Sequence, residues 1–146
     1  MPPMDIIIRE NFNIDLYGFS GIAINKNWAD TGMSLTNKLW QEIKSNQLKH
    51  EGINVWVYES GNKMFAGVGL KEPPPPGTIL ELKKIHLSRY VYYKHTGPYN
   101  KIAETGSKVL EELNQKGIKT SLPYVEIYGH WTEDASKLET EMLWSL

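Results

Sequence analysis

The segment RYVYYKHTGPYNKI, residues 89–102, runs from a strand through a turn into a helix. Its first half is rich in Tyr and Val, which favour a pleated strand. The turn at residues 96–99 contains a Gly-Pro pair, which is typical of the residues just before a helix. Beyond the turn, apolar positions recur at the spacing i, i+4, i+7, i+8 and i+11, which predicts the buried side of an amphipathic helix ending near Gly117. These positions are Ile102, Gly106, Val109, Leu110 and Leu113.

The same order of elements occurs twice when the sequence is followed outward from this segment. Residues 81–95 form the strand that enters the turn, and PYVEIYGHW (residues 123–131) and ETEMLWSL (residues 139–146) supply two strands after the helix. The first half of the chain has the same pattern. Its expected elements are a strand at residues 12–25, a helix from about Met33 to Gln47, and strands at residues 53–59 and 64–70.

A proline run, Pro73–Pro76, separates the two halves, because consecutive prolines continue neither a helix nor a strand. We therefore predict an α+β fold. A duplicated strand–helix–strand–strand unit would form an antiparallel sheet with two main helices and a pocket between the halves. The chain is expected to be a single domain, residues 1–146, with repeat units at about residues 5–72 and 78–146 joined by the proline connector.

Alternation along residues 123–131 gives the strand two different faces. One face carries Tyr124, Glu126, Tyr128 and His130, and the other carries Val125, Ile127 and Trp131, against which the second helix is expected to pack. On a solvated face, Glu126 would simply pair with a Lys of the next strand, whereas in a cavity it would be a specificity group. Alignment of residues 53–59 with residues 123–129 places Trp56 opposite Glu126 and Tyr58 opposite Tyr128, which favours a site where the two copies meet.

Composition narrows the classes of function. The 146 residues carry a net charge of -1 and no cysteine, which argues against a nucleic-acid-binding surface and excludes disulfides and cysteine nucleophiles. No apolar run approaches the ~20 residues of a membrane span, and we expect a cytoplasmic location without membrane contact. The histidines lack metal-ligand spacing, and no phosphate-binding or dinucleotide motif is present, so we predict no metal and no cofactor. His95 is expected to hydrogen-bond the turn that follows it.

The chain resembles the gyrase-inhibitor-like small-molecule-binding domain, which is also the effector-binding domain of AraC-type and MerR-type regulators. The resemblance rests on RYVYYKHTGPYNKI, PYVEIYG, LETEMLWSL and, in the first half, LYGFSG and VWVY. It implies an aromatic pocket, with a buried Glu in many members that take lipophilic cations. Glu126 and Tyr128 match the family's Glu-x-Tyr strand, Glu141 matches the acidic residue of the last strand, and Tyr90 matches the Tyr before the turn. Trp144 departs from the family pattern.

We therefore predict a stand-alone effector-binding protein that takes a hydrophobic ligand, neutral or cationic, with Glu126 as the polar anchor and no catalytic residue. The predicted ligand-binding residues are Trp56, Tyr58, Tyr90, Tyr92, Glu126, Tyr128, Glu141 and Trp144. Tyr92 shares a face with Tyr90 only if their strand contains no bulge. No helix-turn-helix segment is found, so no direct contact with nucleic acid is expected. Two alternatives stay open: a hydrolase of a reactive small molecule using Glu and Tyr in the same pocket, and a gyrase-inhibitor-like module that binds a protein partner.

Overall fold

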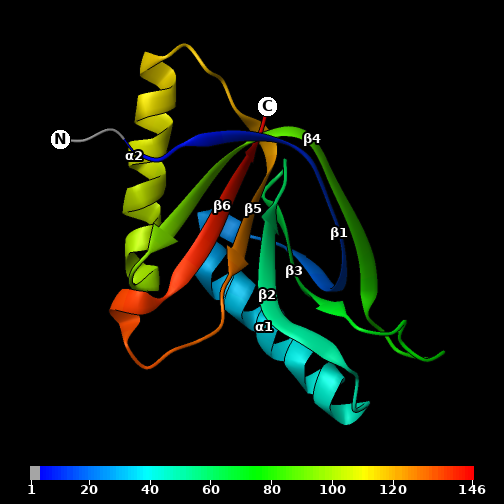
Figure 1. Cartoon of the computed structure of the whole chain (residues 1–146). Coiled ribbons are helices and arrows are strands. Elements are labelled where there is room, and N and C mark those ends of the chain that lie inside the picture. The colour runs from blue at the N-terminus through cyan, green and yellow to red at the C-terminus, as the bar shows by residue number, and fades with distance from the viewer. Residues whose placement is uncertain (1–3) are drawn as a thin grey trace.

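The computed structural model of the chain describes residues 4–146 and contains the predicted order of elements (Figure 1). The order strand, helix, strand, strand occurs twice, which confirms the predicted α+β fold with a duplicated unit and two main helices. The first unit contains β1 Ile7–Ile22, α1 Trp28–Ser45, β2 His50–Tyr58 and β3 Lys63–Leu70. The second contains β4 Glu81–Thr96, α2 Ile102–Gln115, β5 Ser121–Tyr128 and β6 Glu139–Ser145. Short 3-10 helices lie at Ile24–Lys26, Tyr99–Lys101 and Ala135–Lys137.

The six strands form one antiparallel sheet that closes into a barrel in the order β1-β3-β2-β5-β6-β4. At the two junctions between the units, equivalent strands pair with each other: β1 pairs with β4, and β2 pairs with β5. The two units are therefore related by an approximate twofold arrangement. Residues 71–80, which include the prolines, link β3 to β4 and contain neither helix nor strand.

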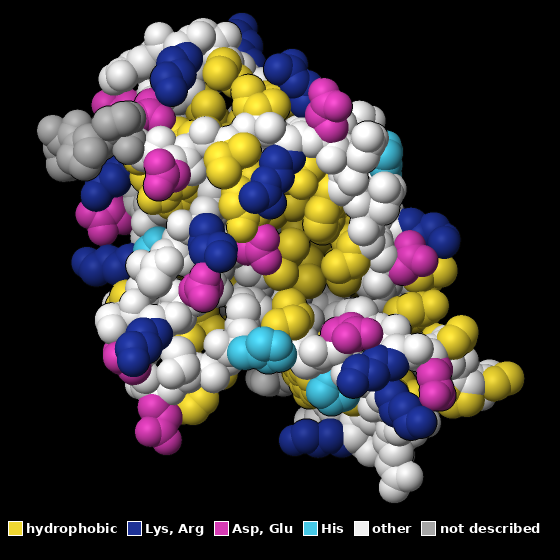
Figure 2. All heavy atoms as spheres, viewed as in Figure 1, with side chains coloured by type: hydrophobic (Ala, Val, Ile, Leu, Met, Phe, Trp, Pro, Cys, Tyr) yellow, Lys and Arg dark blue, Asp and Glu magenta, His cyan; other side chains and the backbone are white. Residues whose placement is uncertain are grey.

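The barrel interior holds the largest of the three buried apolar clusters in residues 4–146. Its members are Leu16, Val55, Val57, Phe65, Ile85, Leu87, Tyr90, Tyr92, Val125 and Leu143. In the view of Figure 2, hydrophobic side chains gather in the middle of the molecule, between β1 and β5, and charged side chains surround them. Because neighbouring residues of a strand point to opposite sides, the residues next to Val125 on β5 point away from this interior.

Each helix covers the outer face of strands from its own unit. Leu39 of α1 packs with Phe19 of β1 and Val68 of β3, and Val109 of α2 packs with Met142 of β6. Strands β2 and β5 lie side by side between these two helix-covered areas. Their outward side chains therefore line the space between α1 and α2, where the predicted pocket between the halves is found.

The packing of α2 corrects two predictions. The helix meets the outer face of the sheet, so it does not pack against Val125 and Ile127, which belong to the interior cluster. Leu110 is 42% exposed, whereas Val109 and Leu113 are buried. Each residue advances about 100° around a helix, so Leu110 lies on the flank of the buried stripe centred on Val109.

Several element boundaries also differ from the predictions. β1 begins at Ile7, because its first residues pair with β4. α1 begins at Trp28, ahead of the apolar pattern that indicated the helix. β5 ends at Tyr128, so His130 and Trp131 lie beyond the strand and do not follow its alternation. Within residues 4–146, no helix is both long and apolar enough to cross a bilayer.

Candidate ligand-binding site

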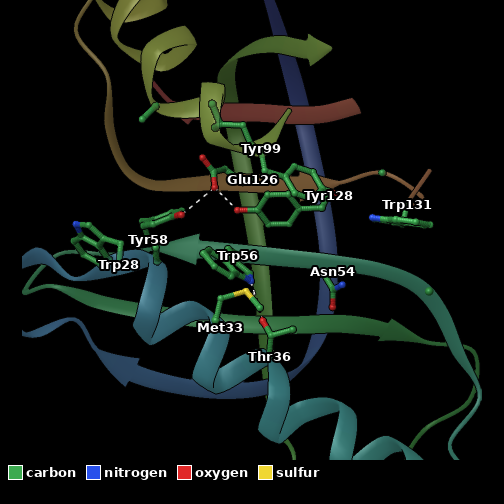
Figure 3. A pocket seen from close by; sticks show the side chains of 15 residues that line it. Trp28, Met33, Thr36, Asn54, Trp56, Tyr58, Tyr99, Glu126, Tyr128 and Trp131 are labelled. Carbon is green, nitrogen blue, oxygen red and sulfur yellow. Dashed lines mark hydrogen bonds between the residues drawn. The ribbon is translucent and has the colours of Figure 1, made fainter. Parts of the chain in front are cut away.

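Glu126 of β5 is a buried carboxylate held by three tyrosine hydroxyls. Its side chain is only 6% exposed. Tyr58 donates a hydrogen bond to Oε1 at 2.9 Å, Tyr124 donates to Oε2 at 2.7 Å, and Tyr128 donates to Oε1. Figure 3 shows the hydroxyls of Tyr58 and Tyr128 directed at the Glu126 carboxylate. These donors suit an ionised carboxylate, which accepts hydrogen bonds and donates none.

Strand geometry explains why the four side chains meet. Tyr124 and Tyr128 stand two residues on either side of Glu126, so all three share one face of β5. Tyr58 is the cross-strand partner of Tyr124, and Trp56 is the partner of Glu126. The rings support each other, with centroids of Tyr58 and Tyr124 at 5.3 Å and of Trp56 and Tyr128 at 5.4 Å. Aromatic packing at these distances fixes the directions of the hydroxyl groups.

The environment keeps the three tyrosines protonated. Burial, followed by the negative charge of Glu126, raises the pKa of Tyr58, Tyr124 and Tyr128 well above the ordinary value of 10.0. They therefore remain hydroxyl donors over the whole physiological pH range. None of the ion pairs found in residues 4–146 involves Glu126. A buried carboxylate without a cationic partner is costly to fold around, and hydrogen bonds offset only part of this cost.

A cavity of about 580 Å³ lies over Glu126 between the two helices (Figure 3). Six aromatic side chains line it: Trp28, Trp56, Tyr58, Tyr99, Tyr128 and Trp131. A second cavity of about 570 Å³ adjoins the first, and Tyr124, Met142 and Trp144 contribute to its wall. Among the described residues that line either cavity, Glu126 carries the only charge. The volumes are in the range of small-molecule sites, and an apolar lining with few polar groups is typical of them.

The position of Trp56 depends on α1. Its indole Nε1 donates a hydrogen bond to the Thr36 hydroxyl at 3.0 Å. Gly32 of the same helix lies against the ring, so that a Cβ atom there would overlap the indole carbons. A glycine inside a helix costs about 1 kcal/mol relative to alanine. At this position it lets the indole lie against the helix backbone and form one wall of the cavity.

No protein-family model and no curated protein matches the chain. Solved structures match it over nearly its whole length. The C-terminal domain of EcmrR gives a TM-score of 0.71 at 17% identity, over 97% of this chain and 96% of that domain. SAV2435 bound to tetraphenylphosphonium gives 0.64 at 19% identity, over 97% and 93%. A hydrolase from Listeria innocua gives 0.56 at 10% identity, over 99% and 92%.

The chain has the fold of the gyrase-inhibitor-like small-molecule-binding domain. This confirms the resemblance seen in the sequence at the level of the fold. At these identities the similarity shows the fold, and the chemistry of the site follows from the contacts described above.

Within this gyrase-inhibitor-like fold, the structure brings together five of the eight residues predicted for ligand binding. Trp56, Tyr58, Glu126 and Tyr128 line the first cavity. Trp144 lines the second, together with Tyr58 and Glu126. The idea of a solvated Glu126 paired with a lysine does not apply, because the carboxylate is buried among tyrosines.

The other three predicted residues lie on the opposite face of the sheet. Tyr90 and Tyr92 belong to the interior cluster, because Val91 between them packs towards α2. Glu141 is the cross-strand partner of Ile127, which is packed against that cluster, so Glu141 lies on the interior side of the sheet. The next residue, Met142, is the partner of Glu126 and lies on the outer side. Burial and then the neighbouring Glu141 raise the pKa of Tyr92. The prediction that these three share a cavity with Glu126 is therefore wrong.

Four aromatic residues of the site were not among the predicted ones. Trp131, which strand alternation assigns to the face opposite Glu126, lies beyond the end of β5 and lines the first cavity. Tyr124 shares the face of Glu126, so strand alternation alone could have included it. Trp28 lies in the first turn of α1, ahead of the helical pattern, and packs against Tyr58 with centroids 5.3 Å apart. Tyr99 lies between the turn and α2, and its ring lies 5.7 Å from that of Tyr128 and lines the first cavity.

His95 has the structural role expected from the sequence. Its Nε2 atom lies 3.1 Å from the carbonyl oxygen of Pro98, and its Nδ1 atom lies 2.8 Å from the Thr105 hydroxyl. With one ring nitrogen donating and the other accepting, the imidazole joins the end of β4 to the start of α2. In the part of the chain that the structure describes, no group of three or more His, Asp or Glu side chains is arranged to hold a metal ion.

Proposed function

We propose that this chain is a small-molecule-binding protein that takes a hydrophobic cation into the space between α1 and α2, with Glu126 as the charged anchor. The carrying observation is the buried Glu126 carboxylate, which is the only charge among the described residues lining two aromatic cavities. A ligand cation would supply the positive charge that the carboxylate lacks. Tyr and Trp faces around it would add on the order of 1 kcal/mol for each favourable contact with the cation.

A protein of the same fold supports this proposal. SAV2435 is a protein of the same fold that was solved bound to tetraphenylphosphonium, an aromatic cation. The C-terminal domain of EcmrR has the same fold, and EcmrR was also solved in a complex with DNA. We propose that the present chain binds a small-molecule effector and senses or carries it without contacting nucleic acid directly, acting alone or through a protein partner. The absence of cysteine is in keeping with the predicted cytoplasmic location.

The proposal is tested with a cation and a neutral molecule of nearly the same shape. Methyltriphenylphosphonium and triphenylphosphine oxide both carry three phenyl groups on phosphorus. The fourth substituent is a methyl group in the phosphonium, which is a cation, and an oxygen atom in the oxide, which is neutral. Calorimetric titration should show that Glu126→Gln weakens binding of the phosphonium about 10- to 150-fold, the scale of a charge-assisted contact. Binding of the oxide should not weaken. Equal losses for both probes would indicate a change of shape and would contradict the proposed role of the charge.

Glu141→Gln is the matched control, because it removes the same charge from the opposite face of the sheet. It should leave the affinities for both probes within about twofold of the wild type, since a partly screened charge that lies outside both cavities contributes little. A loss at Glu141 as large as that at Glu126 would show that a general electrostatic attraction, and not the buried carboxylate, attracts the cation.

A hydrolase is the second candidate function. It is favoured by the contact between Glu126 and the hydroxyls of Tyr58 and Tyr128, which brings a carboxylate base and hydroxyl donors into one cavity. Under the binding proposal, a ligand incubated with the protein is recovered unchanged. An ester or epoxide that the wild type consumes and Glu126→Gln leaves intact would replace the binding proposal with the hydrolase.

A further inference from the structure

The two cavities meet at Glu126 and extend from it in different directions. They share Trp28, Tyr58, Ile102, Ala103 and Glu126 and are nearly equal in volume, at about 580 and 570 Å³. Beyond this shared part, the first cavity continues to Trp131, past the end of β5. The second continues under α2 to Leu122 at the start of β5. The charge therefore lies at the junction of the cavities and not at the end of either.

The hydrogen bonds of the carboxylate follow the same division. Oε1 accepts from Tyr128, which lines only the first cavity. Oε2 accepts from Tyr124, which lines only the second. Tyr58, which lines both, donates to Oε1. One oxygen of Glu126 is thus associated with each cavity, so a cation placed between the two oxygens would have apolar space on both sides.

We propose that the ligand is a cation whose positive charge lies between two apolar arms, one in each cavity. This inference rests on the proposed function, because it assumes that Glu126 binds the charged centre. A ligand with its charge at one end would fill one cavity and leave the other open. A central charge with an aromatic or alkyl group on each side matches both the position of the carboxylate and the similar sizes of the cavities.

The test compares benzyltrimethylammonium, which has one arm, with dibenzyldimethylammonium, which has two arms and the same charge. If both cavities receive an arm, the second benzyl group should tighten binding about tenfold, because an additional ring leaves water. Part of the wall of each cavity is then removed separately, with Trp131→Ala in the first cavity and Leu122→Ala in the second. These side chains are 70% and 52% exposed, so their truncation should leave the fold intact, as circular dichroism would check.

The expected pattern is different for the two probes. The two-armed cation should lose about fivefold in affinity with either variant, because each one removes part of the wall for one arm. The one-armed cation should lose no more than about twofold, since its single ring can use the cavity that remains unchanged. Leu82→Ala is the control, because Leu82 is 49% exposed and lines neither cavity, and it should change neither affinity.

Two results would overturn the inference and leave the proposed function in place, provided that Glu126→Gln still weakens the binding of both probes. In the first, the second arm adds no affinity. In the second, only one of the two cavity variants weakens the binding of the two-armed cation. Either result would mean that the ligand occupies only one cavity. If instead Glu126→Gln changes the affinity of neither probe, the proposed function fails together with the inference.

Discussion

Trp56 and Glu126 are direct cross-strand partners where β2 meets β5, and they also occupy equivalent positions in the two repeated units. The approximate twofold axis that relates the two units therefore passes between these two residues. One copy of the position carries an indole ring and the other a carboxylate. The site is asymmetric for this reason, with an aromatic wall on one side of the junction and a charge on the other, although the backbone around it is nearly symmetric.

The Trp56 wall should depend on Gly32. Gly32→Ala would normally stabilise a helix by about 1 kcal/mol. Here the new methyl group would meet the indole ring, so we expect a net loss of about 1–3 kcal/mol in the free energy of unfolding, as for other overpacked sites. Urea denaturation measures this loss, and affinity for methyltriphenylphosphonium should fall as the ring is displaced into the cavity.

Gly106→Ala in α2 is the matched control for Gly32→Ala. A Cβ atom at residue 106 would approach the Cε atom of Met142 at 3.3 Å, which is the tip of a flexible side chain. The stability of this variant should stay within about 1 kcal/mol of the wild type, or increase. Equal stabilities of the two alanine variants would show that the indole of Trp56 is not confined by Gly32.

The orientation of α2 is tested by two neighbouring truncations. Val109 is fully buried and Leu110 is 42% exposed, although both belong to the apolar pattern of the sequence. Val109→Ala should cost about 1–3 kcal/mol of stability, because it leaves a cavity in a packed cluster. Leu110→Ala should cost less than about 1 kcal/mol, although it removes the larger side chain. Thermal or urea unfolding of both variants gives the comparison, and a larger cost at Leu110 would mean that the helix is rotated from its position here.

The order of elements and the central residues of the site were predictable, while the inner and outer faces of β4 were not. Strand alternation and the duplicated pattern were enough to bring Trp56, Tyr58, Glu126 and Tyr128 together. In β4, however, Tyr90 and Tyr92 point into the barrel and Val91 points to α2, so both faces are apolar. Alternation divides a strand into two faces, but when both faces are buried it does not tell which one lines a cavity.

Trp28 illustrates a different limit. The apolar pattern of α1 identifies the residues that pack on the sheet, and these begin well after the first turn. The first turn instead faces the cavity, where no regular packing pattern is required. A residue that lines an open space between two elements therefore leaves no periodic signal in the sequence.

The proline run is predicted to act only as a connector between the two units. Residues 71–80 contain neither helix nor strand. Replacement of Pro74 and Pro75 by serine should change the free energy of unfolding by no more than about 1 kcal/mol, mainly because the unfolded chain becomes more flexible. Unfolding followed by fluorescence and by circular dichroism should give a single, coincident transition. Two separate transitions would contradict the proposal that the chain folds as one domain.

The last prediction concerns stability at alkaline pH. The pKa values of Tyr58, Tyr124 and Tyr128 are raised in the folded protein, first by burial and then by the Glu126 charge, whereas an unfolded tyrosine titrates near 10.0. Above pH 10 the unfolded chain loses these protons and the folded protein keeps them, so the stability that is complete below pH 10 decreases as the pH rises. Each tyrosine should contribute a loss of about 1.4 kcal/mol per pH unit, or about 4 kcal/mol for the three together. Urea denaturation at pH 9, 10 and 11 measures this slope, and absorbance at 295 nm should show these phenolates appearing only on unfolding. Tyr124→Phe should reduce the slope by about one third, even though it also lowers stability at neutral pH by removing the donor to Oε2. An unchanged slope in this variant would mean that Tyr124 titrates alike in the folded and unfolded states, and that the tyrosine cluster around Glu126 does not hold its protons as the geometry requires.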